Sequence, residues 1–164
     1  MNPISRTVAA IVLIAPIAGA ASMLPLNRWL TDALGIVDQA EARDSLYERL
    51  GGYDTIADVS DDFLDRLLID PTFERFFDGS SGDSRKRIRQ HLVDFLCQST
   101  GGPCFYTGRD MKTAHAGMGV TKEEWDKAVA LIGETLTALK VPAEESQELA
   151  SMLVPLEKDI VEAQ

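Results

Sequence analysis

The spacing of apolar residues predicts an all-helical fold for the part of the chain that begins at Ser45. Apolar positions recur there at intervals of three and four residues, which is the period of an α-helix, and no stretch alternates between apolar and polar residues as a strand would. Glycine and proline signals separate the periodic segments. Longer helices are expected within residues 54–70, 84–100, 121–139 and 142–160, and shorter helical pieces at 45–50 and 110–116.

Polar residues at the predicted helix starts are suited to cap them. Thr121 and Glu124 have the spacing of a capping box, and Asp54 and Ser84 are placed to cap the two earlier long helices. Pro155 lies inside the last helix and should kink it, because proline lacks the backbone N–H and clashes with the preceding turn.

The first 26 residues differ from the rest of the chain, since Arg6 is their one charged side chain. A short positive start, an apolar run over residues 8–26 and the small residues 18–20 predict an export signal that is cleaved before Ala21. An uncleaved membrane anchor is one alternative, because about 20 apolar residues can span a bilayer. A buried helix of a cytosolic protein is another. We expect the domain to be exported to the periplasm or cell envelope, or anchored with the domain outside.

Composition divides the chain into three parts and limits its partners. Residues 1–26 are the signal or anchor, residues 27–44 a linker that could form a short amphipathic helix, and residues 45–162 the domain. With 16 basic and 26 acidic side chains the net charge is −10, which argues against nucleic acid as a partner, because binding phosphates needs a basic surface. The two His and two Cys have no zinc-ligand spacing and are too few for a disulfide-dense scaffold.

Aromatic residues gather in the middle of the domain. Every Phe and Tyr lies between Tyr47 and Tyr106. Such a cluster is either a Phe-rich core or the wall around a flat apolar cofactor. The residues that could converge are Phe63, Phe73, Phe76, Phe77, Phe95, Phe105 and Tyr106.

Any imidazole chemistry rests on two residues, His91 and His115. His115 stands among small residues that would let a planar ring approach its helix, and Met111 lies one turn before it. A lone helical His is most often structural, but a buried neutral imidazole can also ligate haem iron. His91 falls at the edge of the inward stripe of the preceding helix, from which it could reach a metal or point into solvent.

Four stretches of the chain resemble a group I truncated haemoglobin. They are SLYERLGG at 45–52, the FL..LL.DP....FF pattern at 63–77, the HLVDFL....GGP..YTG..M...H pattern at 91–115, and a closing helix at 141–161. The resemblance covers nearly the whole domain. It implies a truncated two-over-two globin sandwich that holds one haem b (iron protoporphyrin IX).

The resemblance also implies roles for particular residues. His115 matches the proximal iron ligand, and Phe77 matches the aromatic residue that packs on the haem face. Lys112 and the cationic run 85–89 could pair with haem propionates. The cofactor site expected from the resemblance comprises Phe63, Leu64, Phe77, Ile88, Leu92, Phe95, Met111, Lys112 and His115.

The expected distal side departs from the family pattern. Leu64 and Leu92 stand where many members have a Tyr and a Gln that hold an oxygen ligand, and Ile88 stands at a third distal position. Oxygen takes up partial negative charge on ferrous iron, so a missing charge-assisted hydrogen bond forfeits roughly 1.5–3 kcal/mol and speeds release about ten- to a hundredfold. His91 matches a position that supplies a sixth iron ligand in some members, so five- and six-coordinate iron both stay open.

Cys97 and Cys104 flank the Gly-Gly-Pro break. In an exported protein they are expected to form a disulfide that clamps the end of the distal helix, with a contribution of roughly 2–3 kcal/mol in the loop-entropy model. In a cytosolic protein both would be free thiols.

The resemblance implies a globin that reversibly binds a diatomic gas, namely oxygen, nitric oxide or carbon monoxide. Two alternatives are also haem proteins. One is a bis-His electron-transfer or gas-sensing protein, and the other is a nitric oxide dioxygenase, which would need an electron donor or reductase. An enzyme is not the favoured interpretation, because the distal side lacks a hydrogen-bond donor. A haem-free helical interaction module is a further alternative.

Overall fold

The computed structural model describes residues 44–162, and every regular element in that range is a helix. The predicted signal or anchor, and almost all of the predicted linker, lie outside the described residues. No helix within 44–162 is long and apolar enough to cross a membrane. In chain order the elements are α2 (Leu46–Leu50), α3 (Tyr53–Ile69), η2 (Pro71–Phe73), α4 (Glu74–Phe77), α5 (Gly82–Ser99), α6 (Met111–His115), α7 (Lys122–Ala138), α8 (Ala143–Leu153), η3 (Val154–Leu156) and α9 (Glu157–Ile160).

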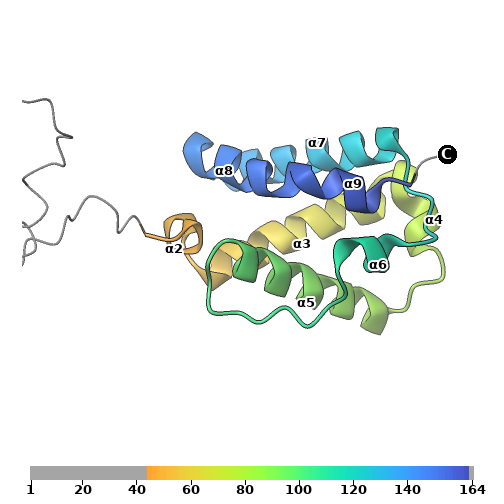
Figure 1. Cartoon of the computed structure of the whole chain (residues 1–164), viewed down its shortest axis with the longest axis horizontal. Helices are drawn as coiled ribbons and strands as arrows, with labels where there is room; N and C mark the ends of the chain where they lie inside the picture. The colour runs from red at the N-terminus through yellow and green to blue at the C-terminus, as the bar shows by residue number, and fades with distance from the viewer. Residues whose placement is uncertain (1–43, 163–164) are drawn as a thin grey trace, which may run out of the picture. The chain divides into compact units, whose positions relative to one another are not determined.

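Two helix pairs form the body of the domain. Helix α3 packs against α5 in one layer and against α7 in the other, and α7 is paired with α8 (Figure 1). Between α3 and α7, the hydroxyl of the fully buried Thr135 donates to Asp62 Oδ1 at 2.6 Å, and Arg66 pairs with the same carboxylate. The Arg66 and Thr135 hydrogen bonds hold the pKa of Asp62 below its usual value, because both favour the carboxylate.

The main core lies where α2, α3, α5, α7 and α8 meet, and its members share nearly complete burial. A second, smaller cluster, built around Trp125 and Ile160, closes the other end of the domain. The buried members of the main core are Leu46, Leu50, Ile56, Val59, Val93, Leu96, Cys97, Ile132, Leu136 and Leu149.

Helix starts were predicted with mixed success. The capping box of Thr121 and Glu124 is confirmed. The predicted cap at Asp54 is wrong, because α3 begins directly after Gly52 with no side-chain cap. The predicted cap at Ser84 is also wrong: the hydroxyl of Ser81 accepts from Ser84 N, so the helix begins three residues earlier.

The interruption expected at Pro155 is confirmed. Helix α8 ends at Leu153, a 3₁₀ turn contains the proline, and the chain resumes as the short helix α9. Residues 71–77 form η2 and the four-residue helix α4. These short elements bring Phe73, Phe76 and Phe77 to the end of α3.

Candidate functional site

A cavity of about 470 Å³ lies inside the domain. Its volume falls within the roughly 300–1,000 Å³ that is usual for cofactor and ligand sites. It is bounded by α3 and α5 on one side, by α4 and α6 at one end, and by α7 with α8 and α9 on the other side. Its lining is mostly apolar and includes Phe63, Phe73, Phe76, Phe77, Leu92, Phe95, Met111, His115, Met118, Val120, Trp125, Val129 and Ile132.

His115 is the one imidazole among the residues that line this cavity. It is the last residue of α6, a five-residue helix capped by Asp110, whose carboxylate accepts from Thr113 N at 2.9 Å. His115 Nδ1 lies 2.8 Å from the carbonyl oxygen of Met111. A carbonyl only accepts, so Nδ1 is the donor in this contact, and in the neutral imidazole the lone pair is then on Nε2. This arrangement leaves Nε2 available to a metal and orients the ring, as second-shell carbonyls do for metal-bound histidines.

Most of the predicted cofactor residues share this cavity. Phe63 comes from α3, Phe77 from α4, Leu92 and Phe95 from α5, and Met111 from α6, beside His115. These side chains are apolar and line the same cavity as the imidazole, which is the environment expected around a flat apolar cofactor.

Two predicted distal residues do not line the cavity. Leu64 is buried in the domain but is not among the residues that line the cavity. Ile88, in the first half of α5, is 40% exposed. Of the three distal positions predicted to be apolar, Leu92 alone lines the cavity in this structure.

His91 also lies away from the cavity. Its side chain is exposed on α5, and its ring meets the edge of Tyr106 with 6.0 Å between ring centroids. Tyr106 in turn packs on Phe95, with centroids 5.4 Å apart. The structure therefore does not bring the two histidines together around one cavity.

The expectation that Phe105 joins the aromatic cluster is wrong. Its side chain is 79% exposed, because the neighbouring Cys104 and Tyr106 are the residues that turn inward from this extended segment. The amide of Tyr106 donates to Gln98 Oε1 at 2.8 Å, which ties the segment to the end of α5.

A disulfide joins Cys97 in α5 to Cys104 in the segment before α6, with 5.7 Å between their Cα atoms. Gly102 lies inside the closed loop. A Cβ atom built there would come 2.5 Å from the Tyr47 ring and 2.7 Å from Cys97 Sγ. The Gly-Gly-Pro break thus lets the backbone approach both the bridge and α2.

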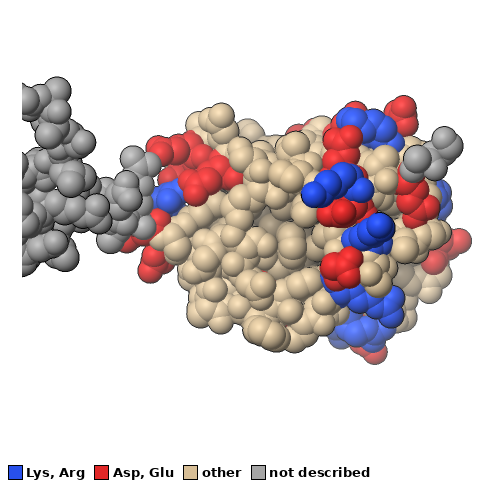
Figure 2. Space-filling model, viewed as in Figure 1, with Lys and Arg blue, Asp and Glu red and all other residues tan. Residues whose placement is uncertain are grey.

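The predicted cationic groups lie outside the cavity. Lys112 is exposed and lines a second hollow of about 340 Å³ on the other side of His115, together with Lys158 and Glu162. In the run 85–89, Arg89 is already paired with Asp61 of α3, with 2.7 Å between Nη2 and Oδ2. Figure 2 shows basic side chains over the beginning of α5 and an uncharged surface beyond them.

Several lining residues were not predicted as part of a site. Trp125, Val129 and Ile132 belong to the apolar stripe of α7, which periodicity marked only as core, and Met118 and Val120 come from the connection after α6. Periodicity identifies a buried face but not which part of it borders a cavity.

The polar groups of the site suit a cofactor held by one ligand. Within residues 44–162, no group of three or more His, Cys, Asp or Glu side chains could hold a bare metal ion. One imidazole with a free Nε2 in an apolar cavity instead suits haem, whose porphyrin supplies the remaining iron ligands in its plane. The fold and the cavity together define a helical haem protein.

Comparison with known proteins identifies the family. A family model described as bacterial-like globin matches residues 45–162. A group 1 truncated haemoglobin of Mycolicibacterium paratuberculosis is 33% identical over 116 residues, covering 71% of this chain and 83% of that protein. The Fe(III) crystal structure of truncated haemoglobin from Tetrahymena pyriformis matches with a TM-score of 0.67 and 27% identity, covering 73% of this chain and 100% of that one. The 2/2 haemoglobin from Synechococcus matches with a TM-score of 0.65 and 27% identity, covering 72% and 98%.

The chain belongs to the bacterial-like globin family. The predicted truncated two-over-two fold is confirmed. Haem is its cofactor, and the chain is a haem-binding globin that binds gas ligands, as the sequence predicted. This result argues against a haem-free interaction module.

Proposed function

We propose that the chain binds a diatomic gas reversibly at an iron whose single protein ligand is His115. The observation that carries this proposal is the hydrogen bond from His115 Nδ1 to the Met111 carbonyl, at 2.8 Å, on a residue that lines the apolar cavity. The bond fixes the tautomer in which Nε2 can ligate iron. The haem supplies the gas-binding iron, and the protein holds it, orients the imidazole and excludes water.

The wall of the cavity formed by α3 and α5 supports an open gas-binding position. Leu92, Phe63 and Phe95 line it, and none of these side chains can donate a hydrogen bond. The exposed position of His91 against Tyr106 favours five-coordinate iron over the bis-His state. Electron transfer or sensing through a bis-His iron is therefore the weaker alternative.

Rapid, reversible exchange of oxygen, nitric oxide or carbon monoxide follows from such a cavity, and oxygen transport is the use that suits fast release. Nitric oxide dioxygenation is less well supported, because Leu92 offers no donor to retain oxygen. That reaction would also require an electron donor or reductase. The ferrous absorption spectrum with and without carbon monoxide tests the proposal, because it distinguishes an open iron position from one closed by His91.

We also propose that the domain works outside the cytoplasm, after export through residues 1–26 or anchored by residues 8–26. The composition of this segment carries the proposal. The Cys97–Cys104 bridge supports it, since stable disulfides belong mainly to oxidising compartments.

Mass spectrometry of the protein purified from the cell envelope is expected to show an N-terminus near Ala21, as a cleaved signal requires. The same intact mass would carry the bridge, which lowers the mass of the dithiol by two hydrogens. An N-terminus at Met1 in the membrane fraction would show that the segment is an uncleaved membrane anchor and not a cleaved signal. Full-length protein in the cytoplasm would contradict export in either form.

A further inference from the structure

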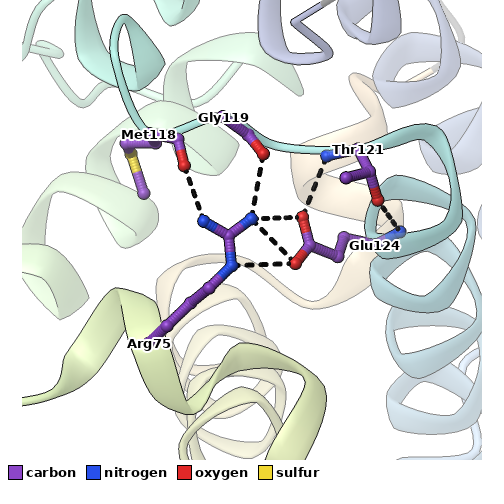
Figure 3. A network of polar contacts seen from close by, with 5 residues as sticks. All are labelled: Arg75, Met118, Gly119, Thr121 and Glu124. Atoms are coloured by element: carbon purple, nitrogen blue, oxygen red, sulfur yellow. Dashed lines mark hydrogen bonds and ion pairs between the residues drawn. The ribbon is translucent and has the colours of Figure 1, made fainter. Parts of the chain in front are cut away.

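Arg75 of α4 makes a network of polar contacts at one end of the cavity (Figure 3). Its Nη1 donates to the carbonyl oxygen of Met118 and its Nη2 to that of Gly119, both at 2.9 Å. The same guanidinium pairs with the carboxylate of Glu124, at 3.1 Å from Nε to Oε1 and at 2.7 Å from Nη2 to Oε2. One side chain thus joins α4 to the connection after His115 and to the start of α7.

Glu124 provides a fixed partner for this guanidinium. Its side chain is only 12% exposed, and its Oε2 accepts from Thr121 N at 2.9 Å in the capping box of α7. Burial alone would raise the pKa of Glu124, but the hydrogen bonds from Thr121 and Arg75 outweigh it and hold that pKa below its usual value. The carboxylate is therefore charged and oriented by the backbone of its own helix.

The residues joined by Arg75 line one end of the cavity from two different elements. Phe76, whose ring centroid lies 4.0 Å from the Arg75 guanidinium carbon, lines the cavity from α4. Met118 lines it from the connection that follows His115. Arg75 contacts both of these elements, and so acts together with the apolar packing of Phe76 and Met118 on Val120, Trp125 and Ile160 to hold them in place.

The elements around His115 need such an attachment. Helix α4 has four residues and α6 has five, so neither is stabilised by more than about a turn of its own hydrogen bonds. The connection after α6 contains Gly117 and Gly119 with φ of +79° and +63°, a conformation that glycine adopts without strain. The far end of this connection is held by Glu162, whose backbone N–H donates to the carbonyl oxygen of Val120 at 2.9 Å.

We propose that Arg75 is a positioning residue for His115. It holds the 118–119 backbone against α4 and so fixes the direction of the imidazole relative to the wall that carries Phe76. The inference rests on the proposed function, in which His115 ligates the iron. Arg75 acts through the 118–119 backbone and through Glu124, which lines the cavity, and does not itself line the cavity.

Replacing Arg75 with glutamine tests this role in the haem-loaded protein. Haem transfer to excess apomyoglobin is expected to become about three- to tenfold faster, the change typical of losing partly exposed charge-assisted hydrogen bonds. The iron–histidine stretching band of the ferrous protein, measured by resonance Raman spectroscopy, is expected to shift or broaden. Arg49→Gln is the matched control, because Arg49 of α2 also donates to a backbone carbonyl, that of Asp44 at 3.0 Å, and also pairs with a glutamate, Glu145, but is not among the residues that line the cavity.

A second variant keeps the test valid if Arg75→Gln folds poorly. Glu124→Gln retains a side chain that suits the capping box and removes only the charge that faces Arg75. It is expected to change the Raman band in the same direction by a smaller amount, and Arg75→Lys is expected to recover part of the effect by pairing with Glu124 as a point charge. A band and a transfer rate equal to those of the Arg49→Gln control would overturn the proposal. An iron–histidine band that survives His115→Ala would instead overturn the proposed function.

Discussion

Replacing His115 with alanine is expected to abolish stable haem binding. The imidazole is the only ligand that the proposal assigns to the iron, since the thioethers of Met111 and Met118 that also line the cavity are weak ligands and the Glu124 carboxylate is paired with Arg75. Loss of a second-shell partner alone typically lowers metal affinity ten- to a hundredfold, so loss of the ligand is expected to cost more than about 100-fold. Absorbance titration of the apoprotein with haem, and haem transfer to apomyoglobin, measure the change.

Substitution of the other histidine provides the matched control. His91→Ala removes an equal side chain from α5, outside the residues that line the cavity, and is expected to leave haem affinity within a few-fold of wild type. Circular dichroism of both apoproteins checks that the helices remain. In His115→Gly, added imidazole is expected to restore the Soret band by occupying the vacated space. Normal haem retention by His115→Ala would contradict the assignment of the proximal ligand.

Replacing Leu92 with glutamine is expected to slow oxygen dissociation by about ten- to a hundredfold. The side chain at this position lines the cavity from α5, and an amide there could donate to an oxygen ligand with partial negative charge. A hydrogen bond of this type contributes roughly 1.5–3 kcal/mol, and each 1.4 kcal/mol is tenfold in a rate or an affinity. Stopped-flow displacement of oxygen by carbon monoxide measures the dissociation rate.

Leu139→Gln is the control for this prediction. Leu139 follows α7, is 37% exposed and does not line the cavity, so the same substitution there adds an amide without approaching the iron. Its oxygen dissociation rate is expected to equal that of wild type. If Leu92→Gln also leaves the rate unchanged, an apolar distal side is not what sets oxygen release in this protein.

Local signals explain why much of the fold could be predicted from the sequence. Helical periodicity located the long helices, and the capping box at Thr121 and the break at Pro155 depend on neighbours within one turn. The small residues around His115 are likewise a local signal, although the resemblance to the globin family was needed to distinguish a haem ligand from a structural histidine.

Contacts between distant residues explain most of what could not be predicted. Arg75 and Glu124 are 49 positions apart, and no local sequence signal next to either residue predicts that they pair. Ser81 and Ser84 are both acceptable caps, and only the backbone path out of α4 decides between them. Cavity lining depends on how helices rotate against each other, which is why Ile88 carries an apolar side chain at the expected register and still faces outward.

The number of protein ligands on the iron is best measured by the ferrous absorption spectrum of the complete haem-loaded protein, recorded with and without carbon monoxide. We expect a high-spin ferrous spectrum and immediate carbon monoxide binding, because His115 is the single proposed protein ligand and His91 lies against Tyr106 outside the cavity. His91→Leu should leave this spectrum unchanged. A low-spin ferrous spectrum with sharp visible bands, displaced slowly by carbon monoxide and converted to high-spin by His91→Leu, would rule out His115 as the single protein ligand and establish a bis-His iron.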